Sequence, residues 1–592
     1  MLMSGNEAAI YGAKTWSVRE RMSRPLVLGV GGMVAAGHYH AAFAGLRVLA
    51  AGGNAIDAGV AAGLVLNVVH NDMCSLSGVA PIVLYHAATG RVTTIAGIGP
   101  FPRAVSLEYF VRERGGRIPP DLSRCVVPAA ADAWLVALRN YGTMRFSDVA
   151  TDAIRLAEEG FPVHHFMARS IKTFLEGYRR HPTNRAIYLR GGEPPQVGDV
   201  VVQRDLAGTL RALCEAEGLA RARTRVQGID AVRDYFYRGP IAGAMVEFSR
   251  RHGGFFSEDD FASFRAAEEP AGRVEYLGYE LYGCGPWSQG PALLIANGIL
   301  SGVPLERFPH NGPDAVHSTV EALKLAFADR ERYCGDPRFV DVPMNRLLSP
   351  AYLAQRRAQL DPTRASPGVP AAGEIPGFPR PAAAAPEPSG APTVGDEIGG
   401  TSYVAAMDRH GNAFSATPSD GYGNGAVIPG LGLHISERGS QSSLDPANPN
   451  VLAPGKRPRL TPNPALVCRG GVPYMAFGSP GNDRQPQAMT QVLGNILRWG
   501  MNPQEAVEEA RVASYSFPSS SYPHAYEPGK LRAETGVPDE TVAELGRRGH
   551  DVERWPRWSW SAGGVCAVVR DPERGVFLGG ADPRREAYVT AL

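Results

Sequence analysis

The sequence predicts a large α+β protein, and three observations indicate this fold class. The chain has 592 residues, of which 44% are hydrophobic, so it can bury a large core and is too apolar to be disordered. Its first half alternates helical stretches with short strand-like runs. After residue 400, strand-like runs between glycine turns predominate. At roughly 150 residues per domain, length alone would allow about four domains.

Two helices and a hairpin are expected near the start of the chain. The first helix covers Ala41–Ala51 and ends at two glycines, and the second covers Ala55–Val69. The second is rich in alanine and glycine, which favours close packing against a sheet. Two short apolar runs, Ile82–Tyr85 and Arg91–Ile95, flank a turn and predict a β-hairpin.

Two further helices are predicted downstream. Apolar residues recur at helical spacing over Ala315–Tyr333, with charged residues on the other faces. After residue 400 we expect one helix, near Pro503–Ala510. Asn502 would cap it, with Pro503 at the first helical position and Glu505 at the third, which is a capping box.

A proline-rich segment separates the two parts of the chain. Residues 361–400 include the run SPGVPAAGEIPGFPRPAAAAPEPSGAP, and proline at this density excludes helix and sheet. We therefore expect a linker or mobile loop, which ends at Gly399-Gly400-Thr401.

Charge and cysteine content exclude several classes of protein. The net charge is +1, so no nucleic-acid partner is expected. The longest apolar run, 58–69, is too short to span a membrane, and the N-terminus lacks the apolar region of a secretory signal. The seven cysteines are scattered without a C-x-x-C motif, which argues against a zinc site and a disulfide framework. These features favour a cytoplasmic protein without a membrane partner.

The junction at Gly400-Thr401 suits self-cleavage of the backbone. A hydroxyl residue opens a strand and follows two glycines, which tolerate the strained backbone that attack by Thr401 on the Gly400 carbonyl requires. Cleavage would leave Thr401 with a free α-amine, which can act as general base for its own hydroxyl. Taken alone, Gly-Gly-Thr before a strand is more often an ordinary loop-to-strand junction.

Several long motifs resemble the gamma-glutamyltranspeptidase family of N-terminal-nucleophile hydrolases. They occur in the family's order: GMVAAGHYHAAFAGLRVLAAGGNAIDAGVAA from Gly32, HSTVEALKLAFADRERYCGDPRFVDVP from His317, GGTSYVAAMDRHGNAFS from Gly399, then PGKRP, FGSPGN and GGADPRREAY. The stretch ERGSQSSLDPANPNVLAPGKRPRLTPNPALV further resembles the family's acylase-like branch.

The resemblance implies a fold and a set of roles. The fold would be a four-layer αββα sandwich, built by a large chain of residues 1–400 and a small chain of residues 401–592 that stay associated. Thr401 matches the nucleophile, and Ser419 falls where the family has a second hydroxyl beside it. Gly481 and Asn482 match the backbone donors of the oxyanion hole. No metal or organic cofactor is required.

Departures from the family pattern argue against a gamma-glutamyl substrate. Ile98 or Pro100 stands where the family has an arginine for the substrate carboxylate, and Arg103 is out of register. Leu460 and Thr461 replace two serines, and the acidic pair for the substrate amine is replaced around 436–441. A site without these polar partners should reject a glutamyl group strongly.

Other side chains are candidates for holding a small-molecule substrate. Arg438 and Arg459 could bind a carboxylate in bidentate fashion, or could be structural ion-pair arginines. Thr461 and Tyr403 are further substrate-binding candidates. His38, His40, His164 and His165 have no carboxylate or cysteine at ligand spacing, so no metal is expected there.

The expected reaction is hydrolysis through an acyl-enzyme. The default substrate is an amide of a small acyl or keto-acid compound. The same nucleophile could cleave a carbon–carbon bond in a bacterial antibiotic biosynthesis pathway, and a third alternative is a catalytically silent binding protein that keeps the fold.

Overall fold

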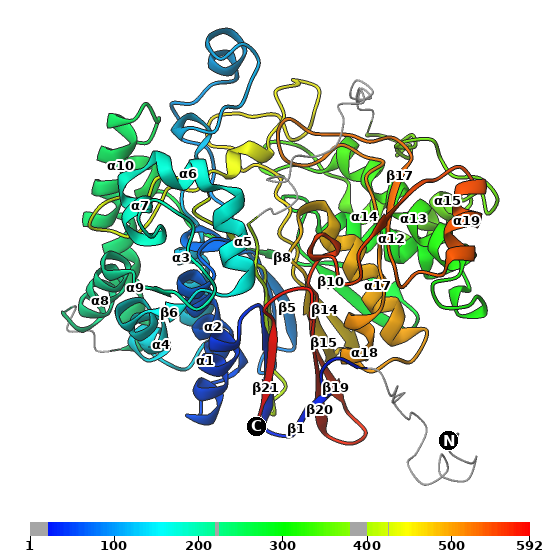
Figure 1. The fold of residues 1–592 in the computed structure, drawn as a ribbon, viewed down its shortest axis with the longest axis horizontal. Helices are drawn as coiled ribbons and strands as arrows, with labels where there is room; N and C mark the ends of the chain where they lie inside the picture. Colours follow the sequence, from blue (N-terminus) through cyan, green and yellow to red (C-terminus); the bar gives the residue numbers. More distant parts are fainter. Residues whose placement is uncertain (1–21, 220–223, 379–399, 424) are drawn as a thin grey trace.

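Two sheets between two groups of helices form the body of the protein (Figure 1). The computed structural model describes residues 22–219, 224–378, 400–423 and 425–592. Two seven-stranded sheets, each antiparallel throughout, lie face to face, and helices cover the outer face of each. The expected four-layer αββα sandwich is therefore confirmed.

Both sheets draw strands from both sides of residue 400. The first sheet has the order β21 (Tyr588–Ala591), β2 (Gly32–Ala36), β11 (Val404–Asp408), β12 (Ala413–Ala416), β4 (Ile82–His86), β5 (Arg91–Ala96), β8 (Ala267–Pro270). The second has the order β1 (Val27–Gly29), β20 (Val576–Ala581), β19 (Cys566–Asp571), β15 (Val472–Gly478), β14 (Ala465–Arg469), β10 (Tyr279–Gly283), β9 (Gly272–Tyr276).

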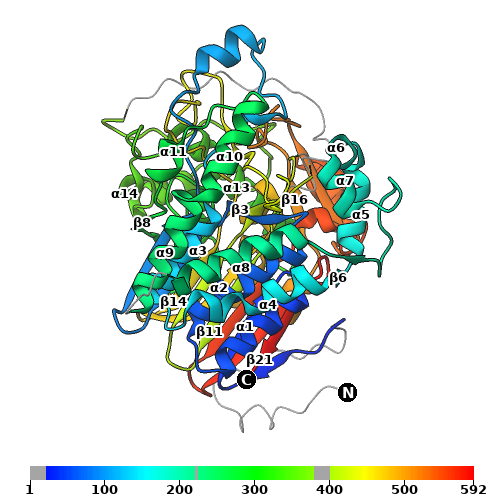
Figure 2. The ribbon, with the colours of Figure 1, turned by 90° about the vertical axis from the view of Figure 1, so that its left-hand side faces the viewer.

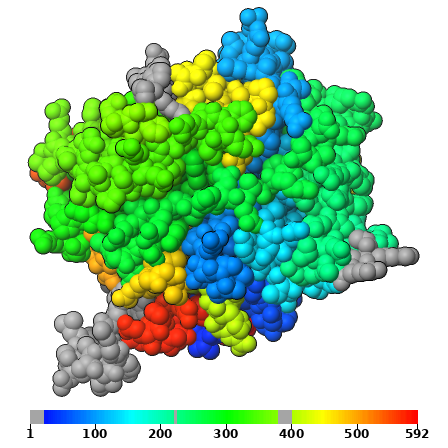
Figure 3. Space-filling model, turned by 180° about the vertical axis from the view of Figure 1, so that it is seen from behind, coloured from blue at the N-terminus to red at the C-terminus, as the bar shows by residue number. Residues whose placement is uncertain are grey.

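Because their strands alternate within each sheet, the two chain segments form one body. β11 lies between β2 and β12 in the first sheet, with Val404 opposite Ala36 and Ala416. Seen from behind, segments before residue 378 and after residue 400 share one continuous surface (Figure 3). A break of the backbone at residue 400 would leave these sheet contacts in place.

Alternation along β11 assigns its residues to two cores. Val404 and Ala406 pack in the core between the first sheet and its helices. Ala405 and Met407 pack in the core between the two sheets. Successive side chains of a strand point to opposite faces, so β11 is buried on both faces of its sheet. This explains why its sequence is apolar without alternation from Val404 to Met407.

The first sheet is covered by a helical layer that faces the viewer in Figure 2. Its larger helices are α1 (Tyr39–Ala50), α2 (Ala55–Val69), α3 (Ala130–Tyr141), α4 (Phe146–Glu159), α8 (Arg204–Leu219), α9 (Arg225–Tyr237) and α10 (Pro240–Arg251). The close packing predicted for α2 is confirmed: a Cβ on Gly59 would lie 2.1 Å from the ring of Phe414 in β12.

The second sheet is covered by a layer around α12 (Gly290–Leu300), α13 (Pro313–Tyr333), α15 (Pro350–Arg357), α17 (Gln485–Leu497) and α18 (Pro503–Glu508). The remaining elements are α5 (His165–Thr173), α6 (Leu175–Arg180), α7 (Pro182–Tyr188), α11 (Glu258–Ala262), α14 (Met344–Leu347), α19 (Asp539–Arg547), β3 (Cys74–Val79), β6 (Phe161–Pro162), β7 (Val200–Val201), β13 (Ser419–Asp420), β16 (Val512–Ser514), β17 (Lys530–Glu534) and β18 (Asp551–Trp555).

Most element predictions are confirmed, and one is wrong. The helix at 55–69, the hairpin and the Asn502 capping box are observed, and the helices predicted from 41 and 315 begin two residues earlier. The expectation of one helix after residue 400 is wrong, because α17 and α19 also form there. α17 buries Met489, Val492, Leu493 and Ile496, whose spacing is helical, so its signal was present in the sequence.

The proline-rich segment is described only in part. Residues 361–378 contain neither helix nor strand, as predicted, whereas 379–399 lie outside the described residues. Among the described helices, none combines the length and the apolar character that crossing a membrane requires.

Candidate active site

Thr401 lies just before β11 and faces Ser419 on a neighbouring segment. The two residues form an antiparallel backbone bridge, and the amide of Ser402 donates to the carbonyl of Pro418 at 2.8 Å. This pairing sets the two hydroxyl oxygens 2.8 Å apart. Both side chains are buried.

Three donors converge on the carbonyl oxygen of Gly400. Arg438 Nη2 donates to it at 2.5 Å and the Asp420 amide at 3.1 Å, and Ser419 Oγ also donates to it. Arg438 Nη2 donates to Ser419 Oγ as well. The peptide bond before Thr401 is therefore polarised at its oxygen, next to a buried hydroxyl.

A glycine is required at position 400. A Cβ there would lie 2.9 Å from the Met73 carbonyl oxygen and 3.0 Å from the Gly421 nitrogen. Both are backbone atoms, which cannot move aside like a flexible side chain. Asp420, on the opposing segment, has φ +80°, a left-handed conformation that aspartate tolerates better than most residues.

Asp420 anchors the donors. Its carboxylate accepts from Ser436 Oγ at 2.5 Å and lies 3.8 Å from both His434 Nε2 and Arg438 Nε. Burial acts to raise the pKa of Asp420, but the nearby His434 and the Arg438 charge outweigh it, so the pKa is lowered overall. The carboxylate is thus ionised and holds the Arg438 guanidinium near Gly400.

The turn that matches the oxyanion hole, Gly481-Asn482, opens α17. Gly481 has φ +125° and Asn482 has φ +50°. The second value is in the left-handed helical region, which asparagine adopts more readily than most non-glycine residues. Asparagine can therefore occupy the position where the family has glycine.

Hydrogen bonds of two glutamines connect this turn to the segment that carries Arg438. Gln289 Nε2 donates to the carbonyls of Asn482 at 2.8 Å and Thr461 at 2.6 Å. Gln441 ends the short helix 438–441, and its Oε1 accepts from the Thr461 amide at 3.0 Å. Thr461 is thus brought between Arg438 and the 481–482 turn.

Comparison with known proteins places the chain in a family. A model of the family described as Gamma-glutamyltranspeptidase matches residues 41–592. The chain belongs to the gamma-glutamyltranspeptidase family. It is accordingly a hydrolase of the N-terminal-nucleophile type.

Individual relatives resemble the chain over nearly its whole length. The glutathione hydrolase-like YwrD proenzyme of Bacillus subtilis (strain 168) is 32% identical, with 96% of this chain and 99% of that protein covered. The solved structure of LmbA2991HD is 33% identical, with a TM-score of 0.88 over 96% of this chain and all of that chain. The cephalosporin acylase from Bacillus halodurans is 29% identical, with a TM-score of 0.82 over 98% and 99% of the two chains.

Two of the positions that depart from the family pattern lie in apolar surroundings. Ile98 and Leu460 are buried in the core between the two sheets. Arg103 points to Ser263 in an exposed contact at 3.2 Å. The segment from Ile98 nevertheless passes the site, because Phe101 packs against Gly439, next to Arg438.

Two of the candidate substrate-binding residues are engaged elsewhere. Arg459 Nη2 donates to both carboxylate oxygens of Glu331, at 2.8 and 3.0 Å. Tyr403 lies in the core between the sheets, and its hydroxyl contacts Ser415 Oγ at 2.7 Å. These contacts favour structural roles for Arg459 and Tyr403.

The Glu331 ion pair yields a stability prediction. Burial acts to raise the pKa of Glu331, but Arg459 and Arg330 lower it to about 2. Because the folded pKa lies below the unfolded value, the pair stabilises the fold above about pH 4.5 and loses this effect as the pH falls toward 2. We expect Glu331→Gln to lower the unfolding free energy by about 3 kcal/mol at pH 7.

Urea unfolding of wild type and Glu331→Gln at pH 7, 4 and 3 measures this difference. It should shrink toward acid pH, because below about pH 4.5 the Glu331 carboxylate of the unfolded chain takes up a proton that the folded protein does not yet bind. An equal difference at all three pH values would contradict the assignment.

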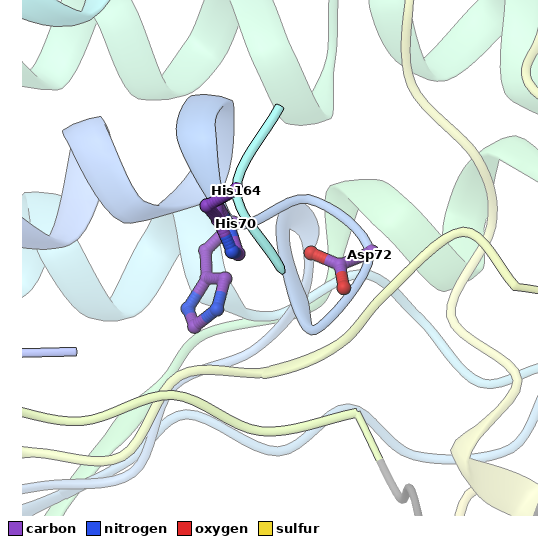
Figure 4. A group of neighbouring side chains, drawn as sticks. All are labelled: His70, Asp72 and His164. Carbon is purple, nitrogen blue, oxygen red and sulfur yellow. The ribbon is translucent and has the colours of Figure 1, made fainter. Parts of the chain in front are cut away.

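A carboxylate accompanies the histidines, contrary to the expectation from the sequence. Asp72 lies beside His70 and His164 (Figure 4). Ligand spacing along the chain does not reveal this carboxylate, because it does not show that the end of α2 meets the start of α5. His70 Nδ1 also contacts Ser402 Oγ at 3.0 Å, one residue from Thr401.

Several residues of the site escaped the sequence analysis. Asp420 lies beside Arg438 and is itself contacted by His434 and Ser436, and Gln289 and Gln441 hold Thr461. None belongs to a spacing motif with a chemical meaning. Asp420 alone carried a signal, since it directly follows Ser419.

Proposed function

We propose that the chain cleaves itself between Gly400 and Thr401 and then uses Thr401 to hydrolyse an amide bond of a small acyl compound. The observation that carries this proposal is the set of contacts at the junction. The Thr401 hydroxyl lies 2.8 Å from Ser419 Oγ, while Ser419, Arg438 and the Asp420 amide all donate to the Gly400 carbonyl.

In the first step, Thr401 Oγ1 attacks the Gly400 carbonyl carbon. Ser419 accepts the Thr401 proton as it gives its own to the Gly400 oxygen, and Arg438 and the Asp420 amide stabilise the charge that develops there. The Gly400–Thr401 C–N bond then breaks, its nitrogen takes up a proton, and an ester joins Gly400 to Thr401 Oγ1. Water hydrolyses the ester, which leaves the Gly400 carboxylate, a free Thr401 amine and the Thr401 hydroxyl.

In the mature enzyme, the Thr401 amine takes the proton of its own hydroxyl when the latter attacks a substrate. The ordinary pKa of an α-amine, about 7.7–8.0, suits a base near neutral pH. The amides of Gly481 and Asn482 would hold the oxyanion. The Thr401 ammonium then gives its proton to the substrate nitrogen, which leaves as the product amine, and water hydrolyses the remaining acyl-enzyme.

The substrate is proposed to be an amide other than a gamma-glutamyl compound. Ile98 and Leu460 offer no polar partner for a glutamyl group, and the similarity to a cephalosporin acylase supports amide cleavage. Arg438 loses the Gly400 carbonyl as a partner when the backbone is cut, so we assign it to a substrate carboxylate. The same groups would also serve carbon–carbon bond cleavage, and mass analysis of the products from a substrate panel distinguishes the two reactions.

Intact-mass measurement of the purified protein tests the proposal directly. We expect two fragments, residues 1–400 and 401–592, that co-elute in gel filtration because both build each sheet. One uncut chain that turns over substrate would contradict self-cleavage. Two fragments without any hydrolytic activity would instead favour a binding protein.

The backbone conformation of Asn482 provides a second prediction. Asn482→Gly should keep near-wild-type kcat, because glycine adopts φ +50° without strain. Asn482→Val should lower kcat at least about tenfold, because a β-branched residue in this region costs roughly 1–2 kcal/mol and shifts the amide donor. Steady-state kinetics on the processed protein measures both. Equal loss in the two variants would mean that the asparagine side chain is needed.

A further inference from the structure

We propose that His70, Asp72 and His164 form a binding site for one divalent transition-metal ion of the zinc class. His70 directly follows α2, Asp72 lies two residues later, and His164 caps the start of α5. One ligand atom of each residue lies within 4.8 Å of the others. Figure 4 shows the Asp72 carboxylate facing the two imidazoles.

Four atoms of this cluster are buried and, among the described residues, have no partner at hydrogen-bonding distance and angle. They are Nε2 of His70, Nε2 of His164 and both carboxylate oxygens of Asp72. Asp72 and His70 are each only 3% exposed. Burying a carboxylate without a partner is costly, so buried charges are normally paired or bind a metal. A cation among these four atoms would satisfy all of them.

The outer nitrogens of both imidazoles have acceptors that would fix the ligating form. A metal-bound histidine usually donates its other N–H to a carboxylate or another oxygen. His70 Nδ1 lies 3.0 Å from Ser402 Oγ, and His164 Nδ1 lies 3.7 Å from Glu586. In the absence of metal, His164 Nδ1 accepts from the Met167 amide at 3.2 Å. If Nε2 bound a metal, Nδ1 would carry the proton and would donate it to Glu586 instead.

The donor set selects the class of metal. Two imidazole nitrogens and one carboxylate suit zinc and its neighbours in the first transition row, whereas calcium and magnesium prefer oxygen ligands throughout. The positive charge of Arg585 also interacts electrostatically with the Asp72 carboxylate. Its guanidinium, however, donates to the Trp560 carbonyl at 3.1 Å, which leaves the carboxylate oxygens available.

A second group also combines two histidines with a carboxylate, but its carboxylate is already paired with a cation. His317 Nδ1 lies 2.9 Å from His550 Nε2, and Glu321 is paired with the Lys324 ammonium at 2.8 Å. A cation already neutralises this carboxylate. Because its charge is already compensated, the second group provides a control for the first.

The bound ion would have a structural role. It would join the end of α2 to the start of α5 and, through His70, hold Ser402 beside Thr401. The inference concerns binding, so it stands independently of self-cleavage and turnover.

Cobalt titration of the chelator-treated, full-length protein tests this site. We expect one Co²⁺ per chain, visible absorption typical of nitrogen and oxygen ligands, and displacement by Zn²⁺. Asp72→Asn, which keeps the shape of the side chain, should weaken Co²⁺ binding by at least about 10–100-fold. His550→Gln, in the second group, should bind like wild type.

Thermal unfolding provides a second readout. Zn²⁺ should raise the Tm of wild type and of His550→Gln, but leave Asp72→Asn unchanged. Wild-type protein that binds no metal would overturn the proposal, as would an Asp72→Asn protein that binds Co²⁺ with wild-type affinity and stoichiometry. Loss of binding in His550→Gln alone would also overturn it, because it would place the metal in the second group.

Discussion

A Thr401→Val protein is expected to remain one uncut chain and to lose turnover by at least about 10⁴-fold. Valine has nearly the shape of threonine but lacks the hydroxyl that attacks Gly400 and, later, the substrate. The side chain is buried, and its hydroxyl contacts Ser419 Oγ. The fold should therefore survive, at a cost of about 1–3 kcal/mol for the hydrogen bond that is lost. Intact-mass spectrometry and a turnover assay measure the two effects.

A nearby threonine separates the chemistry from simple loss of a buried hydroxyl. Thr417 is fully buried, and no residue that the structure describes forms a hydrogen bond with its Oγ1. Thr417→Val should therefore be cleaved and should turn over substrate like wild type. Thr401→Ser, which restores a hydroxyl, should recover cleavage. A Thr401→Val protein that still splits after Gly400 would remove the basis of the proposed function.

The elements that follow local rules could be predicted from the sequence. The Asn54 and Asn502 capping boxes fix the starts of α2 and α18, and the turn at Gly90 fixes the β4–β5 hairpin. The order of strands could not be predicted in this way. Nothing local indicates that β11 inserts between β2 and β12, because pairing between distant segments depends on burial of both faces of the strand.

The same distinction separates the parts of the candidate site. Thr401 and Gly400 form a local motif, so their chemistry could be predicted from the sequence. The role of Arg438 depends on Asp420, which reaches it from another segment, and the ion pair of Arg459 depends on Glu331 in α13. Sequence reasoning left both arginines as equal candidates. Only the partner of each guanidinium distinguishes an arginine at the junction from one that holds a helix in place.

Arg438→Met is the second substitution for which we expect a large effect. Methionine keeps much of the length of the side chain but removes the charged donor to the Gly400 carbonyl, which should slow precursor cleavage by about 10²–10³-fold. Arg438→Lys should be intermediate, because one ammonium cannot contact Gly400, Ser419 and Asp420 with the geometry of a guanidinium. A time course of cleavage after cell-free synthesis gives the rates.

Arg124 supplies the matched control, because its guanidinium pairs with Glu437, beside Arg438, and is not among the donors to Gly400. Arg124→Met should cleave at the wild-type rate. Cleavage involves no substrate, so its rate reports only on the Gly400 carbonyl. Slow cleavage by Arg438→Met, together with a raised KM of its processed fraction for carboxylate substrates, would mean that one guanidinium serves both steps in turn. Unchanged cleavage would restrict Arg438 to substrate binding and leave Ser419 and the Asp420 amide to stabilise the oxyanion.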